Sequence, residues 1–288
     1  MKRLVSGDGW ASRLSAATLI LLIAGAIAIP ALAPTDPRAI GNVLALRFQP
    51  PASVDVAHRF HLLGTDRFGR DLFVRMMLAA RISLLVGVAG SLLAGCAGIA
   101  VGAVAAWRGG VLDRVAMAAS DALLAIPRLI LLLVCASLWR PGAGMVVAVL
   151  VATGWMGVAR LVRSELLGVR GLPFIESARG LGASGWRVLW RHALPNAAGA
   201  AIVAITLGVG SAILLESGLS FLGLGIQPPQ PSWGNMIADG RDSIVTAPWV
   251  ALAPGLAVVV TVLACTLLGD ALRDRLAGED VVLLRDRS

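Results

Sequence analysis

The segment ESARGLGASGWRVLWRHALPN, residues 176–196, is a polar stretch with three arginines in an otherwise apolar part of the chain. An apolar run at residues 141–159 lies upstream of it, and another at residues 197–219 follows it directly. Apolar residues make up 57% of the sequence and charged residues only 15%, whereas a soluble domain carries about 25% charged residues. The sequence therefore predicts an integral membrane protein in which this basic segment lies in water between two membrane spans.

Six apolar runs are long enough to cross a bilayer, because a transmembrane helix needs about 20 mostly apolar residues. The runs cover about residues 14–33, 82–107, 115–139, 141–159, 197–219 and 247–269. They predict an all-α polytopic bundle of six transmembrane helices within residues 14–275, with an N-terminal segment at 1–13 and a tail at 276–288. Residues 34–80 are predicted to form a loop with an interfacial helix near its end.

The third run is the least regular, because Asp121, Pro127 and Arg128 interrupt it. Ionisable residues at membrane depth normally face protein or water, so the whole run would then lie in the interior of the bundle. Alternatively, the membrane portion is only residues 122–139, which leaves Asp121 among the headgroups. Both interpretations are compatible with the sequence.

The first run predicts an uncleaved anchor with a cytoplasmic N-terminus. It ends in Ala31-Leu32-Ala33, which resembles a signal-peptide cleavage site, but Pro34 directly after it argues against cleavage. Lys2, Arg3 and Arg13 precede the run, and basic residues favour the cytoplasmic side. Six spans place both termini on that side. The net charge of +8 then indicates contact with anionic lipid headgroups and not with nucleic acid.

The polar segment predicts a kinked pair of short helices. Residues 173–181 begin with a proline and carry Glu176 in the first turn, both of which favour a helix start. Gly182 lets the backbone reverse, and Ser184 can cap a second helix at 186–193. Such short helices are not stable alone. They need either a groove on another protein or an amphipathic position on the lipid surface, and the residues alone do not distinguish the two.

The same segment resembles the signature loop of the permease subunits of bacterial ABC importers. The matching residues are Glu176, Ser177, Ala178, Gly182, Leu194 and Pro195, with Ser177 in place of the first alanine of the family pattern and His192 in place of its isoleucine. Two further stretches, HLLGTDRFGRDLFVRMMLAARISLLVG (61–87) and ESGLSFLGLGIQPPQPSWGNMIADGRD (216–242), are similar to the dipeptide, oligopeptide and nickel importer permeases, in particular to the dipeptide permease C type.

The resemblance implies a type I ABC importer permease in the bacterial cytoplasmic (inner) membrane, with residues 173–195 as its coupling-helix loop. It implies four kinds of partner: a homologous second permease, two cytoplasmic ATPase subunits, an extracytoplasmic substrate-binding protein and membrane lipid. The implied cargo is a dipeptide or oligopeptide, with a nickel chelate or another solute as the alternative. The implied ATPase-coupling residues are Glu176, Ser177, Ala178, Arg179, Gly182, Arg187, Arg191, Leu194 and Pro195.

The chain's own residues predict that ATP is bound elsewhere. A phosphate-binding loop needs a lysine, and the one lysine of this chain is Lys2. ATP and Mg²⁺ are therefore expected on the ATPase partners, this chain is expected not to be an enzyme, and no cofactor is expected on it.

Three weaker patterns point to other functions. Residues 180–185 match GxGxxG, but a helix and not a strand is predicted before them. Ser184 lies in a GxSG pattern like that of rhomboid-type intramembrane serine proteases, although such a serine needs a histidine base in a membrane pocket. His58 and His61 are three residues apart, a spacing more typical of a solvated surface than of a metal site. No metal site is predicted, and the protease is a remote alternative.

Three charged residues are candidates for the translocation pathway: Glu216, Asp121 and Arg128. Glu216 ends the fifth run, on the outer side in this topology. It either lines the outer mouth of the pathway or bonds to loop backbone there, or it is a snorkelling or capping glutamate at the interface.

Overall fold

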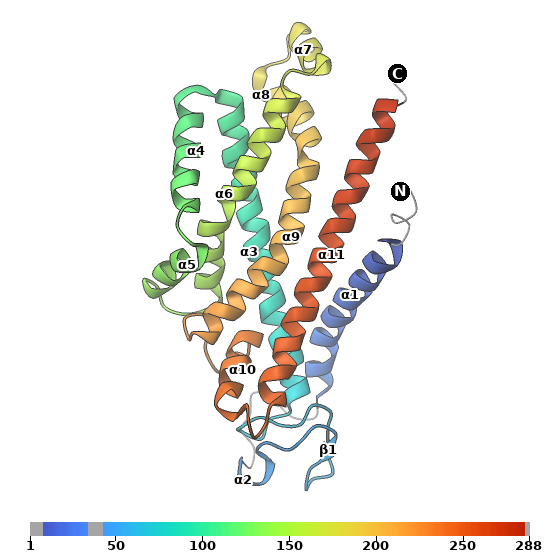
Figure 1. The fold of residues 1–288 in the computed structure, drawn as a ribbon, viewed down its shortest axis with the longest axis vertical. Helices are drawn as coiled ribbons and strands as arrows, with labels where there is room; N and C mark the ends of the chain where they lie inside the picture. Colours follow the sequence, from blue (N-terminus) through green and yellow to red (C-terminus); the bar gives the residue numbers. More distant parts are fainter. Residues whose placement is uncertain (1–7, 34–42, 286–288) are drawn as a thin grey trace.

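The computed structural model of the chain describes residues 8–33 and 43–285, and it is a bundle of long helices with short elements at both ends (Figure 1). Five helices among these residues are long and apolar enough to cross a membrane. They are α1 (Asp8–Leu32), α3 (Leu72–Arg108), α6 (Ala143–Val169), α9 (Leu194–Phe221) and α11 (Trp249–Arg285). A sixth crossing results if α4 (Gly110–Leu124) and α5 (Arg128–Ser137) form one broken span. The expected all-α polytopic membrane fold is confirmed.

The short elements divide between the two ends of the bundle. Figure 1 shows α7 (Pro173–Gly180) and α8 (Gly185–Val188) at the end where α1 begins and α11 finishes. The opposite end carries α2 (Val43–Leu46), α10 (Trp233–Gly240) followed by a 3₁₀ turn (Arg241–Ser243), and two short strands. These strands, β1 (Ser53–Val54) and β2 (Phe60–His61), pair antiparallel with Ser53 opposite His61.

Small residues bring α3 and α6 into backbone contact at the centre of the bundle. A Cβ added to Gly98 would lie 2.6 Å from the carbonyl oxygen of Trp155, and one added to Gly102 would lie 2.4 Å from that of Ala159. Gly98 and Gly102 form a GxxxG pair, a spacing that lets membrane helices approach closely. The two helices therefore pack on their backbones and not on interdigitated side chains at this point.

A proline and an arginine connect α1 to α3. Pro30 lies inside α1 and has no N–H, so the carbonyl oxygen of Ala26, four residues earlier, has no helical donor. Arg81 of α3 supplies it, with Nε donating to the Ala26 oxygen at 2.6 Å and Nη2 donating to the Ile27 oxygen at 2.9 Å. The guanidinium thus satisfies backbone groups that the proline leaves open.

Several helix bounds differ from the sequence-based expectations. The helix expected at 82–107 starts at Leu72, because the Asp71 side chain caps it by accepting the Val74 N–H at 2.9 Å. Within the described residues from 43 to 71 the one helix is α2 at the start of that stretch, so the interfacial helix expected near the end of the loop is instead the first part of α3. The run at 141–159 continues as α6 to Val169, and the run at 247–269 continues as α11 to Arg285. Polar residues at these ends extend each helix beyond its apolar part.

The third run is neither a single helix at 115–139 nor a helix at 122–139. It consists of α4 and α5, which meet at an angle of 90° across a short break. Pro127 in the break is extended (φ −52°, ψ 123°), a conformation that ends a helix, and a proline also biases the residue before it away from helix. Arg163 of α6 donates from Nη2 to Asp113 of α4 at 2.6 Å, which fixes α4 against α6.

The loop before α3 contains the same turn twice. Asp55 accepts the N–H groups of Ala57 and Arg59 and pairs with the Arg59 side chain. Asp66 repeats this arrangement with Phe68 and Arg70. In the first turn, the Arg59 N–H, the Ala57 N–H and the Arg59 guanidinium all favour the carboxylate and lower the pKa of Asp55 to about 2. The Asp55 carboxylate is therefore charged at neutral pH.

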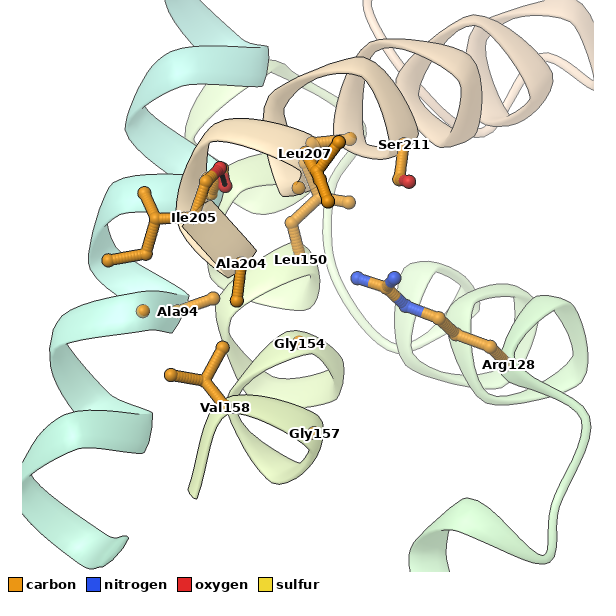
Figure 2. A pocket seen from close by; sticks show the side chains of 15 residues that line it. Ala94, Arg128, Leu150, Gly154, Gly157, Val158, Ala204, Ile205, Leu207 and Ser211 are labelled. Carbon is orange, nitrogen blue, oxygen red and sulfur yellow. Dashed lines mark hydrogen bonds between the residues drawn. The ribbon is translucent and has the colours of Figure 1, made fainter. Parts of the chain in front are cut away.

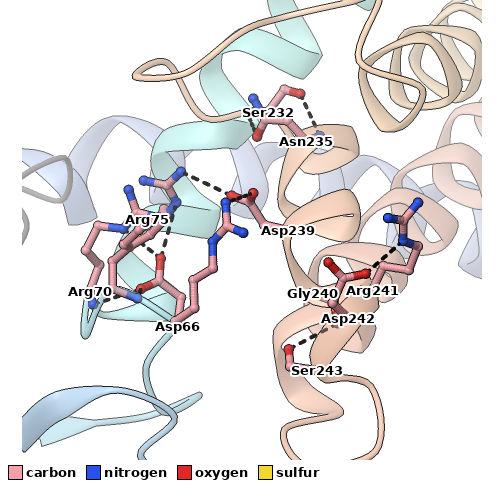
Figure 3. Close-up of polar contacts among 12 residues, drawn as sticks. Asp66, Arg70, Arg75, Ser232, Asn235, Asp239, Gly240, Arg241, Asp242 and Ser243 are labelled. Carbon is pink, nitrogen blue, oxygen red and sulfur yellow. Dashed lines mark hydrogen bonds and ion pairs between the residues drawn. The ribbon is translucent and has the colours of Figure 1, made fainter. Parts of the chain in front are cut away.

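Ion pairs connect this loop to α10. Arg75 at the start of α3 lies between Asp66 of the loop and Asp239 of α10, with nitrogen–oxygen distances of 3.8 and 4.0 Å (Figure 3). Arg67 of the loop reaches the same Asp239 at 2.7 Å. Ser232 and Asn235 form a capping box that starts α10. These ion pairs thus connect the loop 55–71, the start of α3 and residues 232–243 at one end of the molecule.

Glu216 lies in the core of that end, so the expectation of a snorkelling glutamate at the interface is wrong. Its side chain is fully buried. Ser220 donates to one carboxylate oxygen at 2.7 Å and Ser83 of α3 to the other at 3.0 Å. Each serine oxygen also accepts a backbone N–H, from Ile226 and from Trp233 respectively. The carboxylate therefore joins α9, α3 and the beginning of α10.

We expect Glu216→Ala to lower the free energy of unfolding by about 2–4 kcal/mol, because it leaves two buried hydroxyls unpaired and opens a cavity. Glu216→Gln keeps the shape and one acceptor, so its loss should be smaller. The thermal midpoint of each purified variant in detergent measures this. Equal midpoints for Glu216→Ala and the wild type would contradict the assigned network.

Candidate functional site

The hairpin of residues 173–193 protrudes from the end of the bundle that also holds the start of α1 (Figure 1). α7 begins with Pro173 and carries Glu176 in its first turn, as expected. Gly182 adopts a positive φ of 81°, and its N–H and that of Ala183 donate back to α7 to close the turn. Ser184 then caps α8 by accepting the Arg187 N–H at 3.4 Å. Local sequence signals therefore build the predicted pair of short helices.

The second helix of the hairpin does not stop where the sequence suggests. α8 ends at Val188, a π-helical turn at Leu189–Ala193 follows, and α9 starts at Leu194. The whole stretch 185–221 is one helical rod, and it continues through Pro195, the second residue of α9, directly after the π-helical turn. The hairpin is thus continuous with a membrane-crossing helix.

The inner side of the hairpin is fixed by apolar packing. Ile175 of α7 and Val188 of α8 are fully buried. They belong to a cluster with residues of α3, α6, the π-helical turn and α9, namely Ala103, Ala106, Val162, Leu166, Leu189, Ala193, Ala197 and Ala201. Arg170 adds a hydrogen bond to the Ala106 carbonyl oxygen at 3.3 Å. The hairpin is therefore held in place and cannot swing independently of the bundle.

The outer side of the hairpin exposes both apolar and charged residues. Leu181 at the turn is 89% exposed, and Trp186 and Trp190 of the second helix are more than half exposed. Glu176, Arg187 and Arg191 are exposed as well, and none of the three forms an ion pair within the described residues. Arg179, by contrast, lies over the ring of Trp107 at 5.2 Å. An apolar tip ringed by unpaired charges is typical of a protein-docking surface.

The sequence did not single out Leu181, Trp186 and Trp190 as part of this surface. In the sequence these three residues stand out only as large apolar side chains beside turn glycines and arginines. A solvated loop would carry polar side chains at such positions. Trp186 and Trp190 pack edge to face with ring centroids 5.7 Å apart. Such rigid aromatic pairs are common anchors in protein interfaces.

The geometry gives no support to the protease alternative. Ser184 is exposed and its hydroxyl oxygen caps α8. Within the described residues no hydrogen bond joins it to His192, whose carbonyl oxygen accepts the Asn196 side chain instead. In the outer loop, His61 is buried with Nδ1 2.7 Å from Asp71, while His58 is exposed. No group of three or more metal-binding side chains occurs in the parts of the chain that the structure describes.

A cavity of about 360 Å³ lies between α3, α6 and α9, with α5 along one side. Figure 2 shows the side chain of Arg128 pointing from α5 toward this space, which Ser211 of α9 faces from the other side. The remaining lining is apolar or small: Gly90, Ser91, Ala94, Gly95, Leu150, Gly154, Gly157, Val158, Ala204, Ile205, Leu207, Gly208 and Ala212.

Of the three pathway candidates, the structure places one at this cavity. Arg128 lines it, whereas Glu216 and Asp121 do not. Asp121 is exposed and pairs with Arg160 of α6 at 3.1 Å. The sequence missed Ser211 and the glycines of α6 as lining residues, because nothing in a single apolar run shows which of its faces meets a neighbouring helix.

Comparisons with known proteins give a consistent result. The sequence model of the family described as binding-protein-dependent transport system inner membrane component matches residues 98–278. A putative peptide permease protein of Brucella suis biovar 1 (strain 1330) is 44% identical over 74% of this chain and 72% of its own length. The glutathione transport system permease protein GsiD of Pectobacterium atrosepticum is 41% identical over 75% and 72%.

A longer match extends over most of the chain. A putative peptide transport system permease protein of Brucella suis biovar 1 (strain 1330) is 37% identical over 91% of this chain and 86% of its own length. Among solved structures, a chain of the MetNI methionine ABC transporter in inward-facing conformations matches with a TM-score of 0.53. It is 21% identical and covers 69% of this chain and 96% of that chain, so the two share a fold.

Proposed function

The chain belongs to the family of binding-protein-dependent transport system inner membrane components, and we propose that it forms half of a pore that carries peptides into the cell. It is a permease subunit of an ABC importer, a transport subunit and not an enzyme. Two of the relatives are named as peptide permeases and a third as a glutathione permease, and glutathione is itself a small peptide. These names support the peptide cargo.

The family implies an ATPase, a substrate-binding protein and a second permease as partners. In our proposal, these are two cytoplasmic ATPase subunits that bind ATP and Mg²⁺, one extracytoplasmic binding protein and one homologous permease. Both termini and the hairpin of residues 173–193 lie in the cytoplasm of a bacterium, where the exposed Leu181 and unpaired Arg187 and Arg191 dock in an ATPase groove. The surplus of arginines at this end supports that orientation.

The continuity of α8 with α9 supplies a mechanism for coupling. A movement of the hairpin is transmitted along the rod 185–221 without a hinge loop to absorb it. The same rod lines the cavity through six residues of α9: Ala204, Ile205, Leu207, Gly208, Ser211 and Ala212. ATP-driven closure of the ATPases therefore tilts one wall of the cavity, which is how rigid-body rocking alternates access to a central site.

The observation that carries this proposal is the exposed hairpin on a rod that lines the cavity. Its test is uptake into proteoliposomes that contain this chain, its second permease and the ATPases, with binding protein added outside. We expect uptake of labelled trialanine that requires ATP inside and binding protein outside. Absence of ATP-dependent uptake of any peptide would overturn the peptide cargo.

Cysteine labelling in whole cells tests the orientation. Leu181→Cys and Val56→Cys place thiols on residues that are 89% and 82% exposed, at opposite ends of the molecule. A membrane-impermeant maleimide added outside whole cells should label Val56→Cys and leave Leu181→Cys unlabelled until the cells are opened. Labelling of Leu181→Cys in intact cells would place the hairpin outside and contradict the coupling role.

A further inference from the structure

We propose that Arg128 binds the terminal carboxylate of the cargo, so that the cavity between α3, α5, α6 and α9 recognises the one anionic group common to unmodified linear peptides. This inference rests on the proposed peptide cargo and adds a ligand group to it. It assigns to the permease a recognition step of its own, separate from that of the substrate-binding protein.

The charge in the cavity has no partner within the described residues. Arg128 is the one ionisable residue among those that line the cavity, and a guanidinium stays charged in any protein environment. No ion pair or hydrogen bond connects it to another described residue of the chain. Charged side chains at membrane depth are normally paired. Arg128 is exposed in the single chain, so an anion from outside this chain can reach the guanidinium and pair with it.

The position of the guanidinium is set by the backbone around it. The break at Pro127 turns α5 through 90° relative to α4 and directs Arg128 toward α6. A Cβ on Gly154 of α6 would lie 3.2 Å from Arg128 Nη2, so the bare glycine leaves room for the guanidinium. Figure 2 shows the arginine reaching toward the space beside Gly154 and Ser211.

One hydroxyl in the cavity is also available to a ligand. Ser91 donates to the carbonyl oxygen of Ile205 at 2.6 Å and is satisfied. Ser211 is exposed and forms no side-chain hydrogen bond with another described residue. Arg128 and Ser211 face the same space from two helices (Figure 2). A guanidinium and a hydroxyl together match the two oxygens of a carboxylate.

The remaining walls of the cavity explain why only the carboxylate of the peptide would be recognised. Apart from Arg128 and the two serines, the lining consists of glycines, alanines and four aliphatic residues. Such walls offer no charge or buried hydrogen-bonding group that would demand a particular side chain. The volume of about 360 Å³ lies within the range of small-ligand sites, about 300–1,000 Å³. A fixed anion site in a cavity with otherwise small and apolar walls suits peptides whose side chains vary.

Equilibrium binding to the assembled complex in nanodiscs, without the binding protein, tests this inference. The probes are labelled trialanine and trialanine amide, which differ only in the terminal carboxylate. We expect the wild type to bind the acid more tightly than the amide by about tenfold or more, as for a charge-assisted hydrogen bond. Arg128→Gln should remove this preference, and Arg128→Lys should keep part of it because it keeps the charge.

Arg140→Gln is the matched control. Arg140 is exposed, lies between α5 and α6, and does not line the cavity. Its replacement should leave the preference unchanged. The inference is overturned if the wild type binds the acid and the amide equally, or if Arg128→Gln keeps the preference for the acid. Neither result touches the peptide cargo, which ATP-dependent uptake tests separately. If Arg128→Gln fails to assemble with the second permease, Arg128 pairs with that subunit, and the inference is equally overturned.

Discussion

Replacing Gly182 with valine should lower ATP-dependent uptake about 5- to 30-fold while leaving the protein folded in the membrane. Gly182 has φ 81°, a region that costs an L-residue about 1–2 kcal/mol and that β-branched residues avoid. A Cβ there meets nothing within 4 Å, so the substitution strains only the turn of the hairpin. A penalty of 1–2 kcal/mol reduces the population of the docking conformation about 5- to 30-fold.

Gly180→Ala is the control for this experiment. Gly180 is exposed, has no contact within 4 Å of an added Cβ, and lies at the helical end of α7 without a positive φ. Alanine fits there, and uptake should remain near that of the wild type. Membrane levels of both variants are compared by immunoblot, and uptake is measured in proteoliposomes. Wild-type uptake by Gly182→Val would exclude the hairpin as the coupling element.

Gly102→Leu should prevent the bundle from folding. A Cβ at this position would lie 2.4 Å from the carbonyl oxygen of Ala159 and 3.1 Å from its Cα. Because these are backbone atoms, α3 and α6 must separate to admit any side chain. Adding extra methylenes to a packed core costs about 1–3 kcal/mol. Forcing a whole leucine side chain between two helix backbones should cost more free energy than that. The yield of monodisperse protein after extraction measures the effect.

Two further variants distinguish a backbone clash from a general sensitivity to substitution. Gly168→Ala, near the end of α6, places a Cβ where nothing lies within 4 Å, and its yield should equal that of the wild type. Combining Gly102→Leu with Ala159→Gly should give no rescue, because the clash is with the carbonyl oxygen and not with the Ala159 side chain. A rescued yield would show that the helices do not meet on their backbones here.

Glu216 illustrates how the sequence marks a residue without revealing its role. An acid at the end of an apolar run is conspicuous, and the sequence offered the pathway mouth or the interface as its place. Its actual partner, Ser83, lies 133 residues away along the chain, and Trp233 joins the same network from α10. No local pattern contains that pairing. The role of Glu216 follows from how α3, α9 and α10 pack.

The hairpin of residues 173–193 gives the opposite case. The sequence predicts its proline start, its turn glycine and its serine cap. Such features are predictable because helix starts and turns depend on residues within a few positions of one another. The sequence did not reveal that α8 continues into α9, since the polar Arg191 and His192 looked like the end of an element. In the folded chain a π-helical turn at Leu189–Ala193 carries the rod through them.

Membrane insertion, helix content and the outline of the spans follow from the sequence, because the free energy of placing a helix in lipid is a sum over about 20 consecutive residues. The position of Arg128 at a cavity, the pairing of Asp121 with Arg160 and the burial of Glu216 do not follow from it. They depend on the 90° bend between α4 and α5 and on which faces of α3, α6 and α9 meet. Those faces are selected by contacts between residues far apart in the chain, and each apolar run taken alone presents the same hydrophobicity to lipid and to its neighbours.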